Sequence, residues 1–242
     1  MPEILVGVNL PQGNADPEFL ESRLRAFAEA GFDCVEVGLD VLPLIVAGEP
    51  RGQYVDFLQG LLHRFPLRYS AHIGLGVDLR DLPRQALQRK VLETSIGICA
   101  RLGLDPLVLH YEQASRDSRV EAAVVEGHAR AADQAAREGL TLCIENIEVE
   151  RFEPLLELVR QVDRQNFRIA FDTGHAWLSA HYFHFDFLQA FRSCLPHLGH
   201  LHLSDNPGVF EELRIRDRPA YDALPMRYRY AFGSGDIHLP PF

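Results

Sequence analysis

The sequence predicts an α/β protein of the (β/α)8 barrel class, and three observations lead to this prediction. Short runs rich in β-branched and aromatic residues alternate with longer stretches of helical periodicity. The chain has 242 residues, 47% of them apolar, which is enough to bury one sizeable core. Metal-binding residue types stand at the ends of successive predicted strands. We expect a single domain over residues 1–242.

Seven evenly spaced strands are predicted. They are Ile4–Leu10, Cys34–Leu39, Arg68–Ile73, Pro106–Tyr111, Thr141–Ile147, Phe167–Asp172 and Leu198–Ser204. A doubly wound open sheet is the alternative architecture, and the alternation of helices and strands alone does not exclude it. However, the segment Pro11–Asn14 after the first strand matches neither dinucleotide-binding nor phosphate-loop spacing. The barrel is therefore favoured.

The helices between these strands can also be predicted. Asp16 is a candidate cap for the first helix, Pro17 suits its first position, and Gly31 ends it. Its apolar stripe consists of Phe19, Leu20, Leu24 and Phe27. The third helix is predicted from about Pro83 to Leu102 and the fourth from about Ser118 to Glu138.

The composition argues against several classes of function. No apolar run approaches the roughly 20 residues that a membrane span needs, and the first residues lack the pattern of a signal peptide. We therefore expect a cytoplasmic protein with no membrane partner. The net charge of −10 argues against general nucleic-acid binding. The one lysine, Lys90, lies in a helical stretch, which excludes a barrel aldolase with a Schiff-base lysine on a strand.

Residue types that bind metals stand at the C-terminal ends of five successive predicted strands. They are His72, His110, Glu145, Asp172 and His202. In a closed parallel barrel all active-site loops leave from this end, so side chains distant in sequence converge there. Period-two alternation places a mostly small or apolar layer below them: Ser70, Val108, Cys143, Ala170 and His200.

These five residues together predict a metal site. A lone histidine in a strand is more often a hydrogen-bonded core residue than a ligand. Imidazoles and carboxylates gathered at one end of a barrel would be costly to bury without a cation. Mixed imidazole and carboxylate ligands suit zinc, manganese or cobalt. We expect a divalent metal ion, zinc or manganese.

Two further elements extend the cluster. Gly174 is expected to let the chain turn after its strand, which would return His175 towards the same pocket. Near the end of the chain, Asp236 and His238 lie two residues apart and would share one face of an extended segment. Ordinary loop polarity is the alternative for this last pair.

The motifs Cys143–Asn146, Phe171–His175 and His200–Asp205 resemble those of the xylose-isomerase-like TIM barrels. That family includes sugar and sugar-phosphate isomerases and epimerases, as well as the endonuclease IV enzymes of DNA repair, and the resemblance covers nearly the whole chain. It implies that Glu145, Asp172 and His202 bind one divalent metal, with His175 beside the substrate or on another metal.

The endonuclease IV branch implies a larger metal centre. There, the matching positions hold three zinc ions: His72, His110, Glu145, Asp172, His175, His202, Asp236 and His238. The resemblance thus implies one to three metal ions per chain.

The chain departs from the family at its C-terminus. The family supplies a further glutamate from its eighth strand, whereas this sequence stops at Pro240-Pro241-Phe242. We expect a barrel that lacks the seventh helix and the eighth βα unit in this chain, either because the sequence is truncated or because the barrel is closed in another way. An open seventh strand would expose unpaired backbone groups, so a homo-oligomeric partner is a candidate to cover it.

The first functional hypothesis is isomerisation or epimerisation of a sugar, sugar phosphate or related polyol. Glu145 would move a proton and His175 would orient a substrate hydroxyl. Glu36, inside the second strand, is a candidate substrate ligand, with a bond to neighbouring backbone as the alternative. Arg227 and Arg229 are candidates for a lid that meets an anionic group of the substrate, with an ordinary surface loop as the alternative.

Two other classes remain open. Phosphodiester hydrolysis at abasic DNA sites would use clustered metals to generate a hydroxide, and nucleic acid would be a partner only in that case. Against it stand the acidic charge and the segment Ile73–Gly76, which lacks bulky residues to wedge into a duplex. A catalytically inactive barrel used as a binding module is the third hypothesis.

Overall fold

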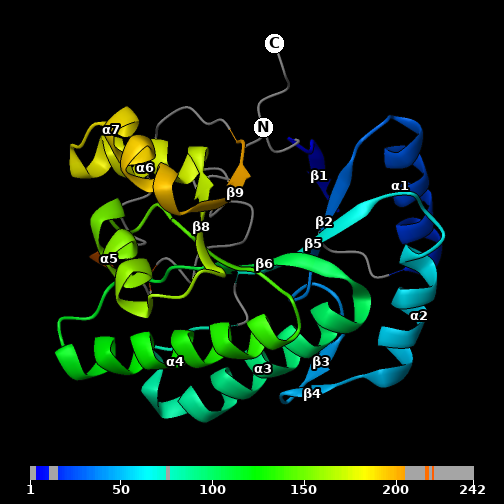
Figure 1. The fold of residues 1–242 in the computed structure, drawn as a ribbon, viewed down its shortest axis with the longest axis horizontal. Helices are drawn as coiled ribbons and strands as arrows, with labels where there is room; N and C mark the ends of the chain where they lie inside the picture. The colour runs from blue at the N-terminus through cyan, green and yellow to red at the C-terminus, as the bar shows by residue number, and fades with distance from the viewer. Residues whose placement is uncertain (1–3, 11–15, 75–76, 205–215, 218–219, 221–242) are drawn as a thin grey trace.

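The central feature of the fold is a curled parallel sheet of seven strands (Figure 1). The computed structural model describes residues 4–10, 16–74, 77–204, 216–217 and 220. The strands follow the order β1-β2-β5-β6-β7-β8-β9. They are β1 (Gly7–Asn9), β2 (Cys34–Gly38), β5 (Arg68–Ile73), β6 (Leu104–His110), β7 (Leu142–Glu145), β8 (Phe167–Asp172) and β9 (Leu198–His202). Each of the seven predicted strands therefore corresponds to an observed one.

The predicted strand bounds were partly wrong. The first strand was expected over Ile4–Leu10 but pairs only over Gly7–Asn9, because among the described residues it pairs only with β2 and their ladder covers three residues. The strand expected from Pro106 begins at Leu104, which pairs with Tyr69 of β5. Ladder pairing, which depends on the neighbouring strand, therefore sets these ends rather than the apolar run alone.

Helices cover the outer face of this sheet (Figure 1). They are α1 (Pro17–Glu29), α2 (Gly52–Leu62), α3 (Gln85–Leu102), α4 (Ser118–Arg137), α5 (Phe152–Val162), α6 (Thr173–Phe183) and α7 (Phe187–Cys194), with 3-10 turns η1 (Leu82–Arg84) and η2 (Leu195–His197). In α1, Asp16 accepts a hydrogen bond from the Glu18 N–H and Leu20 and Leu24 are buried, as predicted. Gly31 follows its end with φ of 84°.

Two features were not predicted. A small antiparallel hairpin, β3 (Ile45–Val46) and β4 (Glu49–Pro50), packs against α3. Its two-residue loop has positive φ at both Ala47 and Gly48, the pattern of a type I′ turn, and an alanine there gives little warning in the sequence. The stretch between β8 and β9 also holds two helices, α6 and α7, where a barrel unit commonly has one.

Strand register sets where the ends of the strands meet. His110 of β6 pairs with Glu145 of β7, and Asp172 of β8 pairs with His202 of β9. Below this level, the inner face of the sheet is filled by a fully buried cluster of Val108, Cys143 and Ala170. This confirms the predicted small and apolar layer in the middle of the sheet and leaves the polar side chains at its C-terminal end.

Candidate metal centre

All five residues predicted at the strand ends converge in the structure, and two others join them. Nitrogen and oxygen atoms lie within 4.8 Å of one another in each of three overlapping groups. The groups are Glu36, His72 and His202; His72, His110 and Glu145; and Glu145, Asp172 and His175. Strands β2, β5, β6, β7, β8 and β9 and the start of α6 thus contribute to one cluster.

Glu145 lies at the centre of this cluster. Its Oε2 is 2.9 Å from Nε2 of His72 and 3.3 Å from Nε2 of His110. Its Oε1 is 2.6 Å from Nδ1 of His202. The side chain is 2% exposed. Because β7 lies between β6 and β8 inside the curled sheet, its last residue reaches imidazoles from strands on both sides. The Glu145 carboxylate therefore contacts three imidazoles.

Electrostatics couple these groups strongly. Burial alone would raise the pKa of Glu145, but the imidazoles of His202, His110 and His72 reverse this and hold the pKa well below its usual value. Burial alone would lower the pKa of His202, but the carboxylates of Glu145 and Glu36 raise that pKa well above 6.5. Positive charge is thus strongly stabilised at this end of the sheet, whether it comes from protons or from a cation.

Asp172 links the strand end to His175. Its carboxylate caps α6 by accepting a hydrogen bond of 2.7 Å from the His175 N–H, and the Ser204 hydroxyl donates to it at 3.1 Å. His175 is therefore placed in the first turn of α6. His175 does lie in the same cluster, as expected, but the predicted reason was wrong: the chain enters a helix directly after Asp172, and Gly174 is one of the buried residues of that helix.

Two polar residues in the same region hold the ends of neighbouring strands together. The Asn146 side-chain amide donates to the Asp172 carbonyl and accepts from the Asp172 N–H, both at 2.9 Å. The Thr173 hydroxyl donates to the Ser204 carbonyl at 2.9 Å and accepts from the Ser204 N–H at 3.0 Å. These bonds fix the backbone on which Asp172 and His175 stand.

Glu148 is a site residue that the sequence analysis missed. It is fully buried, and its Oε2 lies 2.8 Å from Nδ1 of His175. Glu148 follows β7 by three residues, so period-two alternation within the strand does not point to it. The available signal was the repetition of acidic residues, with Glu145 at the end of a buried strand and Glu148 and Glu150 shortly after it.

Glu36 lies on β2 with its carboxylate turned into the cluster. Its Oε2 is 3.1 Å from Nε2 of His202 and 3.4 Å from Nε2 of His200. The Ser70 hydroxyl donates to the same oxygen at 3.4 Å. The alternative for Glu36 was a hydrogen bond to neighbouring backbone. Its Oε2 instead contacts side chains.

Gly74 is the position where the site requires a glycine. A Cβ at this residue would lie 2.6 Å from Cε1 of His110 and 2.7 Å from Cε1 of His72. Both distances are far below van der Waals contact. Without a side chain there, the two rings approach edge to face with centroids 4.8 Å apart.

The donor set fits a divalent cation. The cluster mixes imidazoles and carboxylates, the ligand types preferred by zinc and manganese. Among the described residues, three of its buried atoms have no hydrogen-bond partner: Oε1 of Glu36, Nδ1 of His110, and Nδ1 of His175, which lies beside the Glu148 carboxylate. Buried polar atoms are rarely left in this state, and a bound cation with its waters would supply partners.

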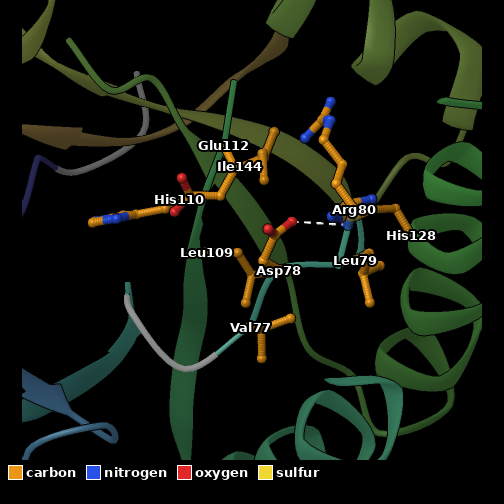
Figure 2. A pocket seen from close by; sticks show the side chains of 9 residues that line it. All are labelled: Val77, Asp78, Leu79, Arg80, Leu109, His110, Glu112, His128 and Ile144. Carbon is orange, nitrogen blue, oxygen red and sulfur yellow. Dashed lines mark hydrogen bonds between the residues drawn. The ribbon is translucent and has the colours of Figure 1, made fainter. Parts of the chain in front are cut away.

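A small cavity lies behind His110 (Figure 2). Its volume is about 10 Å³, and its lining includes Glu112 and the Asp78–Arg80 turn, where the Asp78 carboxylate accepts from the Arg80 N–H. The Arg80 guanidinium lies over the ring of Tyr111 and forms two hydrogen bonds with Glu121. A space of this size holds about one water molecule, so this cavity is not a sugar site.

Four of the predicted site residues lie outside the described residues. They are Asp236, His238, Arg227 and Arg229. Their roles as metal ligands and as a lid stay predictions, and so does the number of metal ions.

Comparisons with known proteins identify the family. No curated protein sequence matches the chain. In the part of the chain that the structure describes, no helix is long and apolar enough to cross a membrane.

Solved structures with a similar fold include several sugar epimerases. D-Allulose 3-epimerase from Methylomonas sp. is 18% identical, with a TM-score of 0.68 over 84% of this chain and 72% of that one. L-Ribulose 3-epimerase is 18% identical, with a TM-score of 0.69 over 86% and 72%. The apo form of 3-keto-D-glucoside 4-epimerase from E. coli is 17% identical, with a TM-score of 0.65 over 92% and 89%. At these identities the likeness establishes the fold.

The family model for xylose isomerase-like TIM barrels matches residues 24–242, which is most of the chain. The seven-stranded curled sheet and the residues at its C-terminal end agree with that match. The chain belongs to the xylose isomerase-like TIM barrel family.

Proposed function

We propose that the chain is a divalent-metal-dependent isomerase or epimerase acting on a sugar, a sugar phosphate or a related polyol. The observation that carries the proposal is the position of Glu145, a buried carboxylate within 3.3 Å of three imidazoles at the C-terminal end of a parallel sheet. Active sites of this fold lie at that end. The three solved epimerases with a similar fold support a sugar substrate.

Glu145, Asp172 and His202 are the proposed ligands of the essential metal. His202 Nδ1 lies 2.6 Å from Glu145 Oε1 and 3.9 Å from Asp172 Oδ2, so both carboxylates stand beside the same nitrogen of His202. When bound there, a divalent cation supplies Lewis-acid polarisation of a carbonyl or hydroxyl oxygen of the substrate. His72 and His110 contact the other oxygen of Glu145 and hold its carboxylate in place.

The protein's own groups would then move the proton. Epimerisation beside a carbonyl requires that a proton leave one face of the carbon and that a proton return to the opposite face. Glu145 is the proposed group on one face, because its carboxylate stands at the strand end beside the imidazoles of His72, His110 and His202. His175, fixed by the α6 cap and by Glu148, would hydrogen-bond a neighbouring substrate hydroxyl and orient the carbon.

A second function, phosphodiester hydrolysis with several metals, has one observation in its favour. The three overlapping ligand groups include His72, His110 and Glu145, which would allow more than one ion. The net charge of −10 opposes binding to a polyanion. The epimerase proposal therefore stands first.

The test is proton exchange at the substrate carbon. The full chain with Mn²⁺ is incubated in D₂O with a panel of ketoses and ketose phosphates, and deuterium at the carbon beside the carbonyl is followed by NMR. We expect deuterium incorporation and a new epimer or isomer for one substrate class. The Glu145→Gln variant should lose this exchange at least 1000-fold, because the proton acceptor is removed.

The matched control is Glu157→Gln, the same chemical change on the exposed face of α5. It should leave the exchange unchanged. Absence of exchange across the panel from a chain that binds metal would count against the proposal. Cleavage of an abasic oligonucleotide by the same preparation would instead favour the second function.

A further inference from the structure

We infer that Glu36 is a positioning residue that orients His202 for metal binding, rather than a substrate ligand. The inference concerns two carboxylates, those of Glu145 and Glu36, which contact the two different nitrogens of the His202 ring. It rests on the proposed metal centre of Glu145, Asp172 and His202.

The two ring nitrogens of His202 face different strands. Nδ1 lies 2.6 Å from Oε1 of Glu145 on β7. Nε2 lies 3.1 Å from Oε2 of Glu36 on β2. A flip of the ring would break both contacts, so the two carboxylates together fix its rotation.

This arrangement assigns a role to each nitrogen. When Nε2 carries the proton that it donates to Glu36, the lone pair of Nδ1 points towards Glu145 and Asp172. A histidine that ligates a metal through one nitrogen commonly donates its other N–H to a carboxylate, which fixes the tautomer and makes the ligand more basic. Glu36 is placed to be that carboxylate.

The surroundings of Glu36 agree with a fixed structural partner. The residue is 6% exposed and sits between Val35 and Val37, which are fully buried on the other face of β2. Its Oε2 is also within 3.4 Å of His200 Nε2 and of the Ser70 hydroxyl. A buried carboxylate is costly unless it is bonded, and three polar neighbours from β5 and β9 bond its Oε2, while Oε1 has no hydrogen-bond partner among the described residues.

The first test uses the unmodified chain loaded with Zn²⁺. Protein labelled with ¹⁵N in its histidine rings is compared with the His202→Gln variant to assign the ring signals. We expect His202 to show a slowly exchanging Nε2–H, shifted downfield by its bond to Glu36, and an Nδ1 without a proton. The opposite tautomer, or an Nε2–H in fast exchange with water, would overturn the inference.

The second test measures Zn²⁺ affinity and metal count by calorimetry and elemental analysis. Removing a carboxylate behind a metal-bound histidine typically costs 10- to 100-fold in metal affinity. We expect a loss of roughly that size in Glu36→Ala, a smaller loss in Glu36→Gln because an amide oxygen can still accept from Nε2, and an unchanged count at saturating metal. Glu157→Gln serves as control and should bind as the original chain does.

The remaining outcomes separate the alternatives. Unchanged Zn²⁺ affinity with a raised KM for the sugar would make Glu36 a substrate ligand, and a lower metal count at saturation would make it a direct ligand. Either result overturns the inference while leaving the metal centre intact. An original chain that binds no Zn²⁺ would overturn the metal centre and this inference together.

Discussion

The middle of the sheet and its two edges are built differently. Every residue of β7 is buried, and all but one of β8 are, because helices cover their outer face and each strand has a neighbouring strand on both sides. On β1 and β9 no residue reaches full burial among the described parts of the chain. Yet the site draws on both regions, with Glu145 and Asp172 from the middle and His202 from an edge.

The two regions therefore make different contributions: the middle strands supply a rigid support, and the edge strand supplies one further side chain. The middle strands carry the carboxylates on a closely packed platform, where small displacements are expensive. The edge strand brings His202 to the same point but depends on side-chain bonds to Glu145 and Glu36 to hold it. We therefore expect substitutions of apolar residues in the middle strands to act on stability, and substitution of His202 at the edge to act on the site.

The largest expected effect is at Phe171 in β8. Its ring is fully buried and packs against Phe191 and Phe187 of α7, with centroids 5.1 and 6.1 Å away. Phe171→Ala should lower the free energy of unfolding by about 3–5 kcal/mol, as measured by denaturant unfolding. Leu201→Ala on the edge strand, where the side chain is 38% exposed, should cost far less. Equal losses at the two positions would break the comparison between middle and edge.

The second effect is pH-dependent and concerns His128 on α4, which packs on Phe167 at the start of β8. Burial lowers the pKa of His128 to about 4, from 6.5. Below pH 6.5 the unfolded chain takes up a proton that the folded chain refuses until about pH 4, so stability should fall across that window by roughly 3 kcal/mol.

Denaturant unfolding at a series of pH values isolates this contribution. His128→Asn keeps a donor for the Val124 carbonyl, which His128 Nδ1 contacts at 2.9 Å, but removes the titration. The difference in stability between the original chain and this variant should shrink or reverse as the pH falls. The exposed His63→Asn variant should preserve the original pH dependence, and a parallel course in all three proteins would contradict the burial argument.

A smaller effect sharpens the comparison inside the site. Gly74→Ala would press a methyl group against the rings of His72 and His110, at a cost of about 1–3 kcal/mol and with weaker metal binding. Gly60→Ala is the matched control, because no atom lies within 4 Å of its added Cβ in the exposed part of α2. It should stabilise the chain by about 0.5–1 kcal/mol. Thermal unfolding and Zn²⁺ titration of both variants measure these effects. A Gly74→Ala variant with unchanged stability and Zn²⁺ affinity would contradict the close approach of residue 74 to the two histidine rings.

Sequence patterns predicted the strands and the five residues at their ends because both follow from periods that the backbone imposes. His72 and His202 face the same centre since each lies at or next to the last residue of a strand of one parallel sheet. Glu148 escaped prediction because it lies in the loop after β7, where no period applies. The role of Gly174 was misjudged because the Asp172 cap starts α6 at once.

Side-chain contacts between distant strands could not be predicted from the sequence either. Which nitrogen of His202 meets Glu36 depends on how β2 and β9 face each other across the curled sheet, and one chain segment does not encode that. The hairpin β3–β4 is similar, since its loop places Ala47 at a positive φ that alanine rarely adopts.

The most direct test of the metal centre is the number of divalent ions per chain after purification, measured by elemental analysis. The original chain and Glu157→Gln are compared with Glu145→Gln, which removes the carboxylate that contacts His72, His110 and His202. We predict at least one zinc or manganese ion per chain in the first two proteins and its loss in the third. A metal-free original chain that also takes up no added Zn²⁺ or Mn²⁺, or an equal count in all three proteins, would contradict the account.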